Sequence, residues 1–252
     1  SSKLIHGGLR YLYNLDFGLV AEGLRERALL LTTTAPHLVK AQPFLWPLKR
    51  RVIERAYSAL GLGLDDAMAV AGHRGRAVPV QKHYSKRGAL HLFPDIRPQA
   101  LVGGIRFYDA RVDDARLVTA LIRTAQSYGA HAASRTQLVD LVRDGQRVVG
   151  AQVVDLHTGE QVRVRARHVI NATGVWTEQT QALATEQAKV QVLMSKGIHI
   201  VVPKERIKGR TGIFLRTEKS VLFIIPWERY WIIGTTDTPW TEDRLRPVAT
   251  RA

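Results

Sequence analysis

The middle of the chain, residues 113–174, constrains the fold most, because it predicts an order of elements that few architectures contain. Asp113 is a good helix N-cap, and the apolar side chains after it recur at three- and four-residue steps. Gly129 is a typical helix stop, so this spacing predicts an amphipathic helix. Residues 137–156 then predict two strands joined by a hairpin turn of the Asp-Gly type.

The second half of this stretch predicts two more strands. Over 162–167, valine and alanine alternate with arginine, which predicts a half-buried strand with a solvated basic face. The run 168–171 is more uniformly apolar and leads to Gly174, so it predicts a buried strand ending in glycine. A helix, a three-stranded meander and a buried strand in this order suit a nucleotide-binding sheet that carries a small antiparallel flap.

The flanking parts of the chain predict a helix, an irregular segment and several antiparallel strands. Helical spacing of apolar residues predicts a helix over 19–31, ending near Ala35-Pro36 because proline disfavours helical geometry in the preceding residue. Prolines interrupt 44–98, which we expect to be irregular and partly helical. From Lys189 onward, the pattern is typical of antiparallel β structure. The predicted strands there cover 190–194, 197–202, 211–216, 221–225 and 230–234.

Composition places the chain among ordinary globular proteins. Its 252 residues fit one large or two modest domains, and 45% hydrophobic with 23% charged residues argues against a disordered chain. No apolar run approaches the roughly 18 residues that cross a bilayer. The chain has no cysteine, which excludes disulfides, a thiolate metal site and a cysteine nucleophile. We predict no metal site.

The net charge is strongly basic and needs an explanation. Subtracting 22 acidic from 37 basic residues gives +15, and residues 49–87 alone hold nine Lys and Arg against three acids. Nucleic acid, an anionic membrane surface and an anionic metabolite are all suitable partners for such a charge. No zinc-finger, RNP-type or helix-turn-helix signature accompanies the basic residues. A solvated, arginine-rich surface explains the charge equally well.

The first twelve residues, SSKLIHGGLRYL, hold the densest set of chemical groups in the chain. Gly7 and Gly8 lack a Cβ and allow the backbone to approach a planar or charged ligand. Arg10 offers a planar fork for phosphate or carboxylate oxygens, and Tyr11 can stack or donate a hydrogen bond. The plainer interpretation is a glycine turn before a helix with a surface arginine.

This opening segment closely resembles the one that follows the dinucleotide fingerprint in FAD-dependent glycerol-3-phosphate dehydrogenases, which are quinone-linked respiratory enzymes. Four further blocks resemble the same family, in the family's order and across nearly the whole chain. They are VDDARL at 112–117, NATGVW at 171–176, KGIHIVVP at 196–203 and IGTTD at 233–237.

The resemblance implies a fold and a domain plan. The fold is α/β (α+β), with an FAD-binding Rossmann-like domain of the glutathione-reductase and D-amino-acid-oxidase type interleaved with an antiparallel β-sheet substrate domain. Residues 1–35 and 110–188 would belong to the FAD-binding domain, and 36–109 with 189–240 to the substrate-binding domain. Residues 241–252 would begin a truncated C-terminal segment.

The resemblance also implies where FAD binds. The residues expected beside the flavin and its pyrophosphate are Ser1, Ser2, Lys3, Leu4, Gly7 and Gly8. Thr173 and Gly174 match a strand end that abuts the cofactor, where glycine permits close backbone approach. Leu138 falls where relatives place a small apolar residue against the adenine.

For the reaction, the resemblance implies oxidation of sn-glycerol 3-phosphate at C2 to dihydroxyacetone phosphate, with hydride transfer to flavin. Arg10 matches the family arginine at the substrate phosphate, and Tyr11 is expected beside it. His199, and after it His6, are candidates for the base or its hydrogen-bond partner, and Asp237 is expected on the same face. A structural role is the alternative for each of them: the two histidines could be core residues hydrogen-bonded to a backbone carbonyl, and Asp237 could cap the turn that follows it.

The resemblance implies further partners. A membrane quinone would accept the electrons, so we expect a cytoplasmic protein held peripherally on the anionic inner face of the cell membrane. A homodimer is left open, and no nucleic acid is expected. A glycerophosphate oxidase that uses oxygen is the nearest alternative, and a basic nucleic-acid or membrane-surface binding module is the alternative of another class.

Two family features are absent from the sequence. The G-x-G-x-x-G phosphate loop would stand about forty residues before Ser1, and a Gly-Gly-Lys block with a substrate-contacting lysine would follow the last residue. We therefore expect an internal fragment of a longer enzyme that binds FAD poorly and is inactive by itself.

Overall fold

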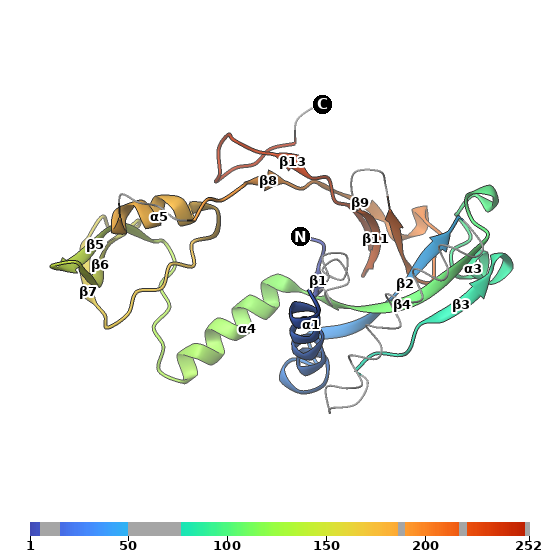
Figure 1. Ribbon diagram of the computed structural model, residues 1–252, viewed down its shortest axis with the longest axis horizontal. Helices are drawn as coiled ribbons and strands as arrows, with labels where there is room; N and C mark the ends of the chain where they lie inside the picture. The colour runs from blue at the N-terminus through green and yellow to red at the C-terminus, as the bar shows by residue number, and fades with distance from the viewer. Residues whose placement is uncertain (6–15, 50–76, 186–189, 217–220, 250–252) are drawn as a thin grey trace. The chain divides into compact units, whose positions relative to one another are not determined.

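The computed structural model divides the chain into two compact units, and it describes most of their residues (Figure 1). The described residues are 1–5, 16–49, 77–185, 190–216 and 221–249. The first unit combines Ser1–Leu121 with Gly197–Asp237, and the second combines Ile122–Lys196 with Thr238–Ala252. Each unit is therefore built from segments that are far apart in the sequence.

An eight-stranded mixed sheet forms the first unit. Along the sheet the strands follow the order β1-β4-β2-β10-β11-β12-β9, and β3 pairs with β4 as a branch. The β10–β2 pair is parallel, and the other pairs described in this sheet are antiparallel. The strands are β1 (Leu4–Ile5), β2 (Val39–Leu48), β3 (Lys82–Ser85), β4 (Gly103–Val112), β9 (His199–Pro203), β10 (Gly212–Arg216), β11 (Val221–Trp227) and β12 (Tyr230–Gly234).

The two faces of this sheet carry separate apolar clusters, as alternating side chains require. One cluster is rich in aromatic rings and consists of Phe44, Leu48, Ile105, Phe107, Ile225 and Ile232. The other consists of Leu45, Ala89, Phe93, Leu101, Ile213 and Trp231. The short helix α3 (Lys86–Leu92) supplies Ala89 to the second cluster. Trp231 is fully buried there, and its ring meets that of Phe93 edge to face.

The expectation of an irregular segment over 44–98 is wrong at its start, because β2 runs through Pro43 and Pro47. The strand pairs with β4 along all ten of its residues. Its parallel pairing with β10 uses Phe44 and Leu45, so the missing N–H groups of the two prolines do not interrupt that pairing.

Helix α1 (Phe17–Leu29) confirms the helix predicted near the N-terminus and continues as a π-helical turn, η2 (Leu30–Thr34). The carboxylate of Asp16 caps it by accepting a hydrogen bond from the backbone N–H of Leu19 at 3.1 Å. Val20, Leu24 and Arg27 lie on one face at helical spacing and are buried.

Arg27 ties this helix to the sheet. Its Nη1 donates to Oδ1 of Asp109 on β4 at 2.9 Å, and both side chains are almost fully buried. The same carboxylate accepts from the backbone N–H of Ala110 at 3.0 Å. This buried charge pair therefore links α1 directly to β4.

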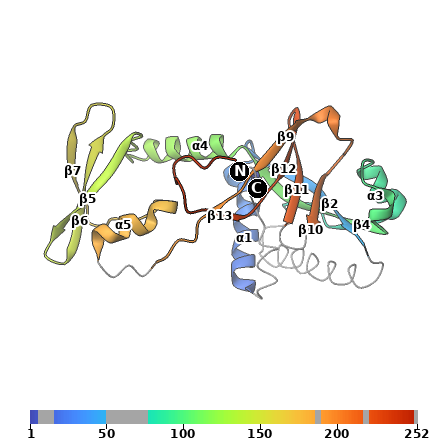
Figure 2. The same cartoon turned by 90° about the horizontal axis from the view of Figure 1, so that it is seen from above.

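The second unit contains the predicted meander, seen on the left in Figure 2. It follows α4 (Asp114–Ser127), whose N-cap is Asp113 and which is followed by Gly129 at φ +89°. The strands are β5 (Thr136–Asp144), β6 (Arg147–Asp155) and β7 (Gln161–Arg165), in that order in the sheet. Gly145 adopts φ +57° in the β5–β6 turn, as an Asp-Gly hairpin requires.

The buried strand predicted at 168–171 is wrong. These residues have no regular structure, and Ile170 is 87% exposed, because no described strand pairs with them. The chain continues through a 3-10 turn, η4 (Gly174–Trp176), into helix α5 (Thr177–Ala184), which lies beside the meander (Figures 1 and 2). The strand predicted at 190–194 is also absent, and β8 (Ser195–Lys196) follows instead and pairs with β13 (Thr238–Pro239).

Candidate functional site

The two ends of the eight-stranded sheet meet at one hydrogen bond. Ser2 lies two residues before Leu4, where β1, the first strand of the sheet order, begins, and His199 begins β9, the last. The Oγ of Ser2 and the Nε2 of His199 are 3.0 Å apart, although the residues are 197 positions apart in the sequence. The sheet must therefore curl until its outer strands approach each other. Both residues were predicted at the site, and the structure brings them together.

The ring of His199 rests on Gly234 of the neighbouring strand β12, its partner in the strand register. A Cβ added to Gly234 would lie 2.7 Å from Cδ2 of the imidazole and 2.8 Å from the carbonyl oxygen of Ile198. A side chain at this position would displace the ring, so glycine is required here. Burial lowers the pKa of His199 below its usual value, which favours the neutral imidazole, the form able to accept a proton.

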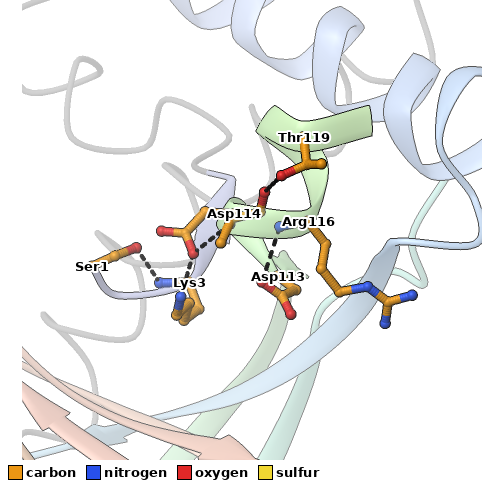
Figure 3. Close-up of polar contacts among 7 residues, drawn as sticks. Ser1, Lys3, Asp113, Asp114, Arg116 and Thr119 are labelled. Carbon is orange, nitrogen blue, oxygen red and sulfur yellow. Dashed lines mark hydrogen bonds and ion pairs between the residues drawn. The ribbon is translucent and has the colours of Figure 1, made fainter. Parts of the chain in front are cut away.

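Lys3 follows Ser2 and is held from several sides (Figure 3). Its φ is +57°, an uncommon conformation for a residue with a side chain. Its ammonium pairs with the carboxylate of Asp114 at the start of α4 and lies 5.6 Å from the centre of the Trp227 ring. Its carbonyl accepts a hydrogen bond from Val112 at 2.9 Å. The sequence predicted Lys3 at the cofactor, whereas the structure also gives its ammonium a partner within the protein.

The carboxyl group of Asp114 is more acidic than an ordinary aspartate. The hydrogen bond from Lys3 lowers the pKa of Asp114 from 3.8 to about 2, so the group is ionised at any physiological pH. The carboxylate also accepts from the backbone N–H of Ala115 at 3.0 Å. The neighbouring Asp113 makes a separate contact, accepting from the N–H of Arg116 at 3.3 Å (Figure 3).

The loop after β12 packs against the start of β9. The hydroxyl of Thr236 accepts from the N–H of Ile198 at 3.0 Å. A Cβ added to Gly197 would lie 2.5 Å from Oγ1 of Thr235, so glycine permits this close approach. Asp237, a predicted site residue, ends this loop with its side chain exposed.

The predicted site residues of the second unit lie at the start of η4 and on β5. The hydroxyl of Thr173 bonds to Oδ1 of Asn171 at 2.7 Å and to the Thr180 hydroxyl at 3.0 Å. Gly174 adopts φ +58°, where nothing lies within 4 Å of an added Cβ, so the backbone conformation rather than space calls for glycine. Leu138 lies on β5, next to a register shift between β5 and β6.

The remaining predicted site residues, His6, Gly7, Gly8, Arg10 and Tyr11, lie outside the described residues. Their roles stay predictions.

The sequence did not single out Asp114 or Gly234 as site residues. Asp114 stands in one of the family-like blocks, but we interpreted its neighbour Asp113 as the helix N-cap and gave Asp114 no role of its own. The signal for Gly234 was the Ile-Gly-Thr-Thr-Asp block itself. In both cases the missing information was the spatial partner, Lys3 or His199.

Comparison with known proteins identifies the family. All 252 residues match the sequence profile of the DAO family, described as FAD dependent oxidoreductase. The chain belongs to this family. The predicted FAD dependence is therefore confirmed at the level of the family.

Curated relatives are consistent with this membership. The chain is 52% identical over 252 residues to a glycerol-3-phosphate dehydrogenase of Mycobacterium leprae, covering 100% of this chain and 42% of that protein. It is 34% identical over 262 residues to an alpha-glycerophosphate oxidase of Enterococcus casseliflavus, again covering 100% of this chain and 42% of the relative. The chain thus spans less than half the length of these relatives.

A solved structure confirms the predicted fold class. The glycerol-3-phosphate dehydrogenase of Bacillus halodurans, solved in complex with FAD, superposes with a TM-score of 0.75 at 25% identity. The match covers 99% of this chain and 42% of that structure.

The described residues of the first unit suit a flavin in their chemistry. Ser1 and Ser2 offer hydroxyls, Lys3 a cation and His199 a largely neutral imidazole, and none of the four is fully buried. Hydroxyl and ammonium donors match the carbonyl and nitrogen acceptors on the polar edge of an isoalloxazine. The donor set therefore fits FAD.

Proposed function

We propose that the protein carrying this chain oxidises sn-glycerol 3-phosphate to dihydroxyacetone phosphate with FAD as cofactor. The observation that carries the proposal is the 52% identity to a glycerol-3-phosphate dehydrogenase along the entire chain. The meeting of Ser2 and His199 supports it, because this contact assembles a polar pair from two of the family-like blocks.

In this reaction the substrate loses a proton from the C2 hydroxyl and a hydride from C2. Bound FAD supplies the acceptor for the hydride. His199 takes the hydroxyl proton in our proposal, because its lowered pKa keeps the imidazole neutral and able to act as a base. Ser2 fixes the ring by its hydrogen bond at Nε2, in which the Nε2–H donates to the Ser2 oxygen, so Nδ1 is the nitrogen that receives the substrate proton. Loss of the two hydrogens leaves the C2 carbonyl of dihydroxyacetone phosphate.

The substrate phosphate is assigned to Arg10, with Tyr11 beside it. A guanidinium binds phosphate oxygens through two parallel charge-assisted hydrogen bonds, which would hold C2 at a fixed distance from the base. The net charge of +15 also favours capture of a dianionic substrate.

For the electron acceptor we propose a membrane quinone, with the protein bound peripherally to the anionic cytoplasmic face of the membrane. Among the helices in the described part of the chain, none has both the length and the apolar character to span a bilayer. Oxygen is the second candidate acceptor, favoured by the 34% identity to an alpha-glycerophosphate oxidase.

The proposal is tested on the full-length protein. We expect a yellow protein with a flavin absorbance band at about 450 nm. Under anaerobic conditions, this band should bleach when glycerol 3-phosphate is added. Arg10→Ala should retain FAD but raise KM by about tenfold or more, since a charge-assisted contact is lost. A flavin that ignores the substrate would refute the proposed reaction, and an unchanged KM would refute the role of Arg10.

The acceptor is tested in the same preparation. A dehydrogenase should reduce a soluble quinone analogue much faster than it consumes oxygen. If oxygen is consumed as fast as the substrate is oxidised, the proposed quinone is wrong and oxygen is the acceptor.

A further inference from the structure

The pair formed by Lys3 and Asp114 lies directly beside the Ser2–His199 contact and has no part in the proposed proton transfer. Lys3 is the residue after Ser2, so the position of the Ser2 hydroxyl depends on the backbone at Lys3. That backbone has φ +57°, which costs a residue with a Cβ about 1 kcal/mol or more unless its surroundings hold it.

Three hydrogen bonds hold Lys3 in this conformation, in addition to the contact of its ammonium with the Trp227 ring. The ammonium pairs with the Asp114 carboxylate, the carbonyl accepts from the N–H of Val112 at 2.9 Å, and the N–H donates to the Ser1 hydroxyl at 3.1 Å. Figure 3 shows Ser1, Lys3 and Asp114 gathered at the first turn of α4. Asp114 is anchored in turn, because its carboxylate accepts from the N–H of Ala115.

We propose that Asp114 is a positioning residue, which acts through Lys3 to hold the Ser2 hydroxyl against Nε2 of His199. The assignment deepens the proposed function and rests on it for its catalytic consequence. The chain of contacts runs from the start of α4 through Lys3 to Ser2, and from there across the meeting edges of the sheet to β9.

The neighbouring Asp113 provides a matched control. Asp113→Asn and Asp114→Asn remove the same charge from adjacent positions at the same helix start. Asparagine also caps helices well, so the Asp113→Asn variant should keep α4 intact. Asp113 contacts the N–H of Arg116 and is not part of the chain of contacts to Ser2.

The first measurement is the ring nitrogen chemical shifts of His199 in the full-length, FAD-loaded protein with 15N-labelled histidine. Asp114→Asn should move the His199 signals in the same direction as Ser2→Ala, because both release Nε2 from the serine hydroxyl. Lys3→Met, which keeps the aliphatic chain but removes the cation, should do the same. Asp113→Asn should leave the signals in place.

The second measurement is a double-mutant cycle on flavin reduction by glycerol 3-phosphate. Asp114→Asn and Ser2→Ala should each lower the rate by about tenfold, which is less than the roughly 10²–10⁴-fold that general base catalysis contributes, because the base stays in place and loses only its orientation. Asp114→Asn should add little in the Ser2→Ala background, since the contact that it supports is already gone.

Several results would overturn the assignment. These are unchanged His199 signals in Asp114→Asn and Lys3→Met, an equal change in Asp113→Asn, or a full additional loss in the double variant. The ring signals report the contact even if glycerol 3-phosphate proves not to be the substrate. Failure of the proposed function would therefore appear as an unresponsive flavin with the expected His199 signals.

Discussion

At the scale of single residues, the site depends on positions that do no chemistry themselves. Gly234 gives the His199 ring its place, and Asp114 compensates the charge of Lys3. Neither residue carries a reactive group in the proposed mechanism. Substitutions at such positions test whether the geometry, rather than the reactive groups alone, produces the activity.

Gly234→Ala should disturb the site through its Cβ. The new methyl group would lie 2.7 Å from the imidazole and 2.8 Å from a backbone oxygen, so the strands must shift. We expect a loss of about 1–3 kcal/mol in unfolding free energy, measured by denaturant titration, together with slower flavin reduction. Gly18→Ala is the control, because its Cβ would make an ordinary 3.8 Å contact on α1. Equal stability of the two variants would contradict the packing of His199 on Gly234.

Asp114 should make stability depend on pH in a defined window. Its pKa falls from 3.8 to about 2 on folding because of the Lys3 contact. The contribution is therefore complete above pH 3.8 and is lost as the pH falls toward about 2. The difference in unfolding free energy between wild type and Asp114→Asn should shrink across this window. A difference that stays constant from neutral to acid pH would contradict this assignment.

At the scale of elements, α1 is joined to the sheet by a buried charge pair rather than by apolar contacts alone. Arg27 and Asp109 are almost fully buried and 2.9 Å apart. Removal of one member takes this ion pair away from a charge that stays buried, which is more costly than loss of a surface pair.

Arg27→Met should test this anchoring, because methionine keeps part of the side-chain volume. We expect a loss of about 3–5 kcal/mol in unfolding free energy, since the buried Asp109 carboxylate would lose the Arg27 guanidinium. Arg25→Met on the same helix is the control, as Arg25 is exposed, and it should change stability by about 0.5 kcal/mol or less. Equal effects of the two substitutions on thermal and denaturant unfolding would refute the anchoring role.

Elements with a strong local signal could be predicted, and elements that depend on distant partners could not. The periodicity of α4 and the Asp-Gly turn between β5 and β6 are local, and both were predicted correctly. β2 was missed because its pairing with β4 outweighs two prolines that argue against a strand. At residues 168–171 a strand was predicted and is absent, since an apolar run forms a strand only beside a pairing partner.

The site shows the same division. Ser2, Lys3 and His199 were named through resemblance to a family, and their identities carried that signal. Their contacts were not predictable, because Ser2 meets His199 across 197 residues and Lys3 meets Asp114 across 111.

At the scale of the whole molecule, the strongly basic net charge is the property that bears on where the protein binds. The net +15 is spread over a chain with ordinary hydrophobic content. Attraction to an anionic surface is a long-range effect that weakens with added salt, because the Debye length is about 8 Å at physiological ionic strength.

The full-length protein should bind vesicles that contain anionic phospholipid. Cosedimentation should be strong at low salt, since each basic residue near the membrane surface contributes about 1 kcal/mol to binding. It should decline as the salt concentration rises through about 0.15 M, because salt screens this attraction. Neutral vesicles are the control and should retain little protein. Equal retention on both vesicle types would contradict electrostatic attachment, and tighter binding to DNA together with no response to glycerol 3-phosphate would favour the nucleic-acid alternative.

The contact between Ser2 and His199, which joins the two ends of the eight-stranded sheet, has a consequence for biosynthesis. Because Ser2 finds His199 nearly two hundred residues later, the ribosome has to complete β9 before this contact can exist. Contacts of such long sequence separation form slowly, so the emerging polypeptide would hold β1 before β9 is there to approach it. Premature termination before His199 should therefore yield a chain that lacks the reactive pair altogether, however well its earlier strands fold.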